Sequence, residues 1–126
     1  MRLLLDTHIV LWWAANASSL RDDIRVAIAS ADDVYISAAS AWEAEIKRSQ
    51  GKLSFPGAFA DVLEKNGFSA LPVTMDDAAA IATLPVYHKD PFDRMLVVQA
   101  MSARLTLVTA DSYLARYGVT ILDARA

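Results

Sequence analysis

The chain has 126 residues, 55% of them hydrophobic, and a formal net charge of −3. That length suits a single domain over 1–126, and no apolar run approaches the roughly 20 residues that a membrane-spanning helix needs. The absence of cysteine excludes disulfides and thiolate zinc sites and fits a cytoplasmic protein. The acidic balance argues against binding nucleic acid through bulk positive charge, whereas the apolar content indicates a surface that meets a partner.

The first half of the chain alternates between strand and helix patterns. Apolar or β-branched runs predict strands, and apolar residues at helical spacing predict helices. Pro56 is expected at the start of one helix, which ends at Asn66-Gly67. The expected strands cover 2–5 and 34–37, and the expected helices cover 8–15, 20–31, 41–48 and 56–66.

The second half continues the alternation. Strands are expected over 70–73, 105–109 and 119–122, and helices over 76–84, 91–104 and 112–117. Alternating apolar strands and helices predict an α/β three-layer sandwich, in which helices cover both faces of a parallel sheet of four to five strands. Sites in such sheets form beyond the carboxyl ends of the strands.

Four acidic residues stand where the expected strands give way to helices: Asp6, Glu43, Asp93 and Asp111. Each has a structural explanation as a helix-start residue. The stretch from Ser40 to Glu43 fits a capping box that would place Glu43 in a first helical turn, and Asp90 fits an N-cap before Asp93.

Taken together, the acids point to a metal. Two unit charges ~4 Å apart repel by about 4 kcal/mol at an effective dielectric constant of 20, so converging carboxylates need a cation. Without cysteine, and with only two histidines, the chain lacks a typical zinc site. Carboxylates suit Mg²⁺ or Mn²⁺, which activate water against phosphodiesters.

The chain resembles the PIN domain family, and within it the VapC-like toxins of bacterial toxin–antitoxin pairs. The stretches LLLDTHIVLWW, SAASAWEAEIKRSQGKL, HKDPFDRMLVVQA and LTLVTADSYL carry the resemblance in the family's order. It implies a metal-dependent endoribonuclease with Mg²⁺ or Mn²⁺, an RNA substrate, an inhibiting antitoxin and a homodimer. The family's acidic tetrad carries over to Asp6, Glu43, Asp93 and Asp111, although the family varies at the fourth position.

Thr109 and Ser112 stand on either side of the fourth acid, where they either hold a metal-bound water, orient the acids or cap the last helix. Lys47 stands one turn beyond Glu43, which fits an ion pair or a phosphate contact. His88 lies in the loop before Asp93; a lone loop histidine is usually neither a base nor a donor to a site, so the catalytic set leaves it out.

Other side chains are expected outside the acidic set. His8 is expected to be structural. Of Trp12 and Trp13, one is expected to pack inside and the other to meet a partner. Trp42 either lines a groove or joins the core.

Two other functions stay open. One is a catalytically silent PIN-like binding module, which has no need of all four acids. The other is a receiver-like signalling domain, which needs a phospho-acceptor aspartate after a central strand and a lysine after the last strand. The tail VTILDARA contains no lysine.

Overall fold

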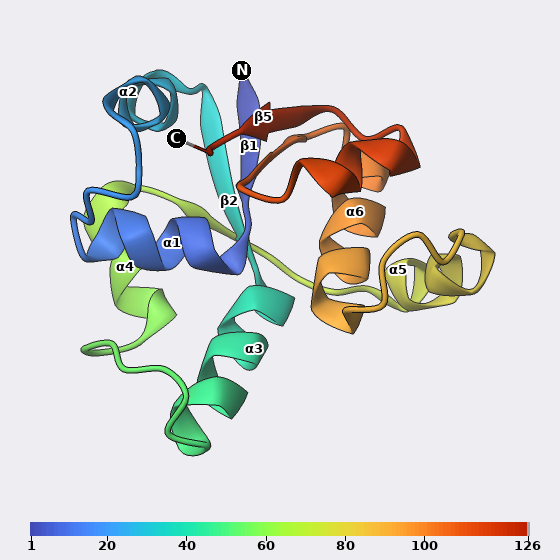
Figure 1. Cartoon of the computed structure of the whole chain (residues 1–126), viewed down its shortest axis with the longest axis horizontal. Coiled ribbons are helices and arrows are strands. Elements are labelled where there is room, and N and C mark those ends of the chain that lie inside the picture. Colours follow the sequence, from blue (N-terminus) through green and yellow to red (C-terminus); the bar gives the residue numbers. More distant parts are fainter. Residues whose placement is uncertain (126) are drawn as a thin grey trace.

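A five-stranded parallel sheet forms the centre of the molecule (Figure 1). The structure is a computed structural model that describes residues 1–125. The strands run in the order β3-β2-β1-β4-β5, so the first strand of the chain is the middle of the sheet. The strands are β1 (Arg2–Leu5), β2 (Asp33–Ser37), β3 (Ser69–Leu71), β4 (Thr106–Thr109) and β5 (Ile121–Asp123).

Helices cover both faces of the sheet, as the sequence predicted. Leu3 and Leu5 of β1 point into one core with α1, α2 and α4, while Leu4 points into a second core with α6 and η2. All three leucines are fully buried, and burial of each side chain stabilises the fold by about 1.5–3 kcal/mol. The α-helices are α1 (Thr7–Ala14), α2 (Asp22–Ser30), α3 (Ala38–Ser49), α4 (Phe59–Asn66), α5 (Met75–Ala80) and α6 (Pro91–Ala103), and the 3₁₀ helices are η1 (Ile81–Thr83) and η2 (Ser112–Tyr117).

The largest difference from the sequence prediction is the start of α3. Ser37, the last residue of β2, accepts a hydrogen bond from the Ala39 N–H at 3.0 Å and caps a helix that begins at Ala38. The capping box predicted at Ser40 is therefore wrong, and Glu43 lies in the second helical turn. The Ser40 hydroxyl is buried and has no hydrogen-bond partner within residues 1–125.

Smaller differences have local causes. The helix expected from Pro56 begins at Phe59, because the Asp61 carboxylate accepts a hydrogen bond from the Ala58 N–H and fixes the first turn there. The helix expected over 76–84 divides into α5 and η1, and 112–117 forms a 3₁₀ helix. Among the residues described, no helix is long and apolar enough to cross a bilayer.

The carboxyl ends of the central strands meet at one edge of the sheet. Leu5, at the end of β1, pairs with Ile36 of β2 and with Val108 of β4. The Asp6 N–H continues the ladder to the Val108 carbonyl at 3.0 Å. Figure 1 shows α1 and α3 leaving this same end of β1 and β2. The segments that follow these strands are thereby brought together in space.

We expect Ser37→Ala to lower the free energy of unfolding by about 1–3 kcal/mol, since it removes a helix cap and leaves a buried partner unpaired. The Ser37 hydroxyl donates to Gln99 Oε1 at 2.6 Å, and Gln99 is 1% exposed. Urea denaturation measures the change. Ser30→Ala, on the exposed end of α2, is the control and should change little. Equal stability of the two variants would contradict this account of the β2–α3 junction.

Candidate functional site

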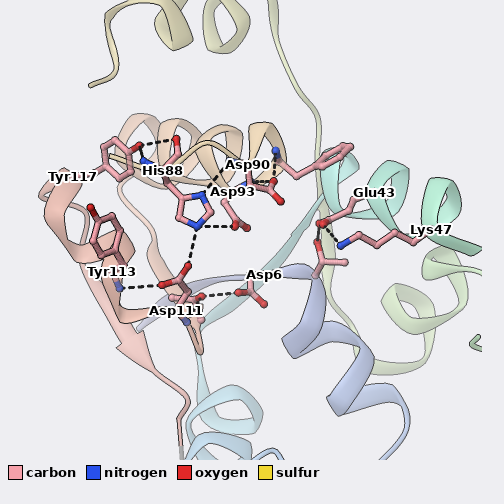
Figure 2. Close-up of polar contacts among 12 residues, drawn as sticks. Asp6, Glu43, Lys47, His88, Asp90, Asp93, Asp111, Tyr113 and Tyr117 are labelled. Atoms are coloured by element: carbon pink, nitrogen blue, oxygen red, sulfur yellow. Dashed lines mark hydrogen bonds and ion pairs between the residues drawn. The ribbon is translucent and has the colours of Figure 1, made fainter. Parts of the chain in front are cut away.

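The four acids predicted from the sequence line a single cavity of about 390 Å³ at the carboxyl edge of the sheet. They come from four different segments: the β1–α1 junction, α3, the first turn of α6, and the β4–η2 junction. Figure 2 shows them around a shared space. The cavity is lined by Asp6, His8, Trp12, Glu43, Lys47, Asp90, Asp93, Ala110 and Asp111.

Asp6 is buried and held by two donors. It caps α1, where its Oδ1 accepts from the Ile9 N–H at 3.1 Å, and its Oδ2 accepts from the Thr109 hydroxyl at 2.6 Å. Burial raises the pKa of Asp6 above its ordinary value, although the Thr109 and Ile9 hydrogen bonds oppose that rise. The two hydrogen bonds thus fix the orientation of the Asp6 carboxylate, while burial leaves its negative charge poorly solvated.

Glu43 is 4% exposed and also has two donors. Its Oε1 accepts from the Thr7 hydroxyl at 2.5 Å, and its Oε2 accepts from Lys47 Nζ at 2.8 Å. Lys47 therefore makes the i,i+4 ion pair, and the hydrogen bond to Glu43 raises the pKa of the Lys47 ammonium. A phosphate contact by Lys47 stays a prediction.

Asp93 differs from the other acids because, among the described residues, no donor lies within hydrogen-bond distance of its carboxylate; His88 Nε2 lies 3.6 Å from it. It lies in the first turn of α6, whose N-cap, Asp90, accepts from the Phe92 and Asp93 N–H groups. The pKa of Asp93 is raised to about 7, chiefly by burial and then by the charges of Asp90, Asp6 and Glu43, while His88 acts in the opposite direction. The cavity therefore carries more negative charge than its own cations compensate.

Asp111 is the most exposed of the four, and its two oxygens accept from different elements. Oδ1 accepts from the Tyr113 N–H at 3.1 Å and caps η2, while His88 Nε2 lies 3.0 Å from Oδ2. Thr109 accepts from the Asp111 N–H at 3.0 Å while donating to Asp6, so it links the two acids. The side chain of Ser112 makes no hydrogen bond within residues 1–125.

His88, which the sequence analysis left out of the catalytic set, lies beside two of the four acids, Asp93 and Asp111. Its Nε2 also lies 3.6 Å from Asp93 Oδ2, and potential ligand atoms of His88, Asp93 and Asp111 lie within 4.8 Å of one another. The sequence feature that could have identified His88 is its place two residues before Asp90, the N-cap of α6. Because Asp90 turns the chain into α6, its N–H meets His88 Nδ1 at 3.1 Å and folds the ring back toward the acids.

His8, which was expected to be structural, is exposed and lines the cavity. Trp12 and Trp13 are both half-buried against the first core; Trp13 packs on Phe68. Trp42 does not join the core: it is 64% exposed and contacts Phe92 edge-on.

The donor set fits a hard divalent cation. Five of the residues that line the cavity carry carboxylates, and carboxylate ligands suit Mg²⁺ and Mn²⁺. A cation would also relieve the repulsion that raises the pKa of Asp93. The residues that could hold it are Asp93 with Asp6, Glu43 and Asp111.

A sequence model of the PIN domain matches residues 3–119. The chain belongs to the PIN domain family. Ribonuclease VapC22 of Mycobacterium tuberculosis is 31% identical over 114 residues, which cover 86% of each chain. This assignment removes the receiver-like alternative.

Solved structures with this PIN fold include toxin–antitoxin complexes. The chain superposes on DNA-bound VapBC from Salmonella typhimurium with a TM-score of 0.69 at 20% identity, covering 98% of each chain. The superposition on VapBC2 from Rickettsia felis, bound to a promoter fragment, has a TM-score of 0.70 at 14% identity and covers 98% of each chain. The superposition on FitAcB from Neisseria gonorrhoeae has a TM-score of 0.67 at 21% identity and covers 97% of each chain. At these identities the likeness establishes the fold.

We expect the metal-free protein to lose stability as the pH rises from about 4 to about 7. The folded-state pKa of Asp93, about 7, lies above its usual value of 3.8, so in this range the folded state binds more protons than the unfolded state. Asp6 acts in the same direction. Thermal unfolding in EDTA at about pH 5 and about pH 8 measures the fall.

Asp93→Asn should make that fall smaller, and Mn²⁺ should raise the melting temperature of the unmodified chain most at the higher pH. Glu64→Gln, on the exposed surface of α4, is the matched control and should keep the original pH dependence. A pH dependence of Asp93→Asn identical to that of the unmodified chain would show that Asp93 titrates normally.

Proposed function

We propose that this chain is a metal-dependent endoribonuclease and the toxin of a toxin–antitoxin pair, acting as one PIN-like domain over residues 1–126. The observation that carries the proposal is the group of four carboxylates around one cavity, in a chain with a ribonuclease VapC relative. The substrate class is RNA, and the reaction is hydrolysis of a phosphodiester bond. Such a substrate fits action in the cytoplasm.

Asp6, Glu43, Asp93 and Asp111 would hold Mg²⁺ or Mn²⁺. The bound ion supplies positive charge for a phosphate oxygen and lowers the pKa of water so that it can attack phosphorus. Thr7 and Lys47 hold Glu43, while Thr109 holds Asp6, so the chain orients these carboxylates in advance. Preorganised ligands need little rearrangement when charge develops in the transition state.

The same charges explain why RNA would need the cation. Without it, the buried carboxylates repel a phosphodiester, and Lys47 is already paired with Glu43. With it, the phosphate is attracted to the cavity. His8 and Trp12 of α1 line the same cavity, where they could contact the nucleotide beside the cleaved bond.

The partners that we propose are an antitoxin and a second copy of the chain. The structural relatives were solved as VapBC and FitAcB complexes. Apolar surface supports protein contacts: a groove of about 470 Å³ lies between α3 and α6, lined by Trp42, Phe92 and Met95 among others. A basic antitoxin side chain at the acidic cavity would compensate its charge and block substrate.

Cleavage of single-stranded RNA should require Mg²⁺ or Mn²⁺ and stop in EDTA. Asp6→Asn and Asp93→Asn should each lower kcat by at least about 100-fold, because each removes charge that holds the cation. Gel analysis of end-labelled RNA measures cleavage, and thermal unfolding verifies that the variants fold. Glu64→Gln on α4 and Asp76→Asn on α5 remove exposed charges that do not line the cavity, and these variants should cleave normally. Normal cleavage by both tetrad variants would overturn the proposal, and metal-independent RNA binding without cleavage would favour a silent binding module.

A further inference from the structure

We propose that His88 is a positioning residue of the metal centre, which holds Asp111 beside Asp93 through a single tautomer of its ring. The proposal rests on the proposed function, because it concerns the same acids. It goes further by giving a role to a residue outside the acidic tetrad. Figure 2 shows Nε2 of the His88 ring facing the carboxylates of both Asp93 and Asp111.

The tautomer follows from the backbone of Asp90. The Asp90 N–H donates to His88 Nδ1 at 3.1 Å, so Nδ1 presents its lone pair to that donor. In the neutral ring the proton is then on Nε2, which lies 3.0 Å from Asp111 Oδ2 and donates to it. A ring in this state has no free lone pair for a cation. His88 is therefore a hydrogen-bond donor to the acids, and not a third ligand beside them.

The position of the ring is fixed from both sides. The His88 N–H donates to the Tyr117 hydroxyl at 2.9 Å, and Tyr117 is buried in the second core. The loop before α6 is thus tied to η2 twice, once by the backbone of His88 and once by its side chain. These two contacts set α6, which carries Asp93, against the segment that carries Asp111.

Asp111 needs such a contact more than the other acids do. Its side chain is 42% exposed, against 25% for Asp93, and the only other donor to its carboxylate within residues 1–125 is the Tyr113 N–H. Loss of the His88 donor would leave Asp111 free to turn away from the charge of Asp93. Because Asp111 is also linked through Thr109 to Asp6, His88 stands at the end of a chain of hydrogen bonds that joins two of the four acids, Asp111 and Asp6.

Two variants separate the donor from the shape of the ring. His88→Gln can place an amide N–H where Nε2–H was, whereas His88→Phe keeps a ring and has no donor. Calorimetric titration of the full chain with Mn²⁺ should give a Kd about 10- to 100-fold weaker for His88→Phe, the usual effect of losing a partner that orients a metal ligand. His88→Gln should recover most of that loss. Thermal unfolding in EDTA shows whether the two variants are equally folded.

The ring tautomer provides a readout that is independent of cleavage. Nitrogen-15 NMR of the metal-free protein should show His88 protonated at Nε2, and addition of Mg²⁺ should leave that proton in place. A proton on Nδ1, or loss of the Nε2 proton on Mg²⁺ binding, would make His88 a ligand and overturn the proposal.

Equal Mn²⁺ affinity of His88→Phe and the unmodified chain would also overturn the proposal. In that case normal metal-dependent RNA cleavage by the unmodified chain would leave the proposed function standing. An unmodified chain that neither binds Mn²⁺ nor cleaves RNA would overturn both.

Discussion

The repulsion among carboxylates gathered at one edge of a parallel sheet is the constraint on which the rest of this site depends. Parallel strands end at the same edge, so acids that follow β1 and β4 come close to those on α3 and α6. Burying their charges is unfavourable in free energy, and the raised pKa values of Asp6 and Asp93 reflect this. The fold accepts this cost at one place only if a cation or a positively charged partner relieves it.

The chain reduces that cost unevenly. Glu43 accepts hydrogen bonds from a hydroxyl and an ammonium, and Asp6 accepts from a hydroxyl and a backbone N–H. Asp111 accepts from an imidazole and a backbone N–H. Asp93 alone among the four has no donor within the described chain. The arrangement orients three carboxylates and leaves the fourth as the point of greatest uncompensated charge, which is where a divalent cation gains the most electrostatic free energy.

The sequence predicted the parts of this arrangement that depend on local pattern. Asp6 follows an apolar strand directly, Asp111 comes two residues after another strand, and Asp93 follows the Asp90-Pro91 helix start. Their proximity could therefore be inferred from the ends of strands and the start of a helix. The beginning of α3 could not, because Ser37 and Ser40 are both good caps and the choice depends on Gln99, 62 positions away, which accepts from Ser37. The position of the His88 ring could not be predicted for a similar reason: it depends on a turn at Asp90 and on Asp111, which lies 23 positions further along.

Anomalous diffraction from a crystal of the unmodified chain soaked in Mn²⁺ tests the central claim most directly. We expect an ion in the acidic cavity, ligated by Asp93 and by at least one carboxylate from another segment of the tetrad. An ordered structure in which Mn²⁺ binds elsewhere, or in which Asp6, Glu43, Asp93 and Asp111 point away from one another around an ion-free cavity, would contradict it.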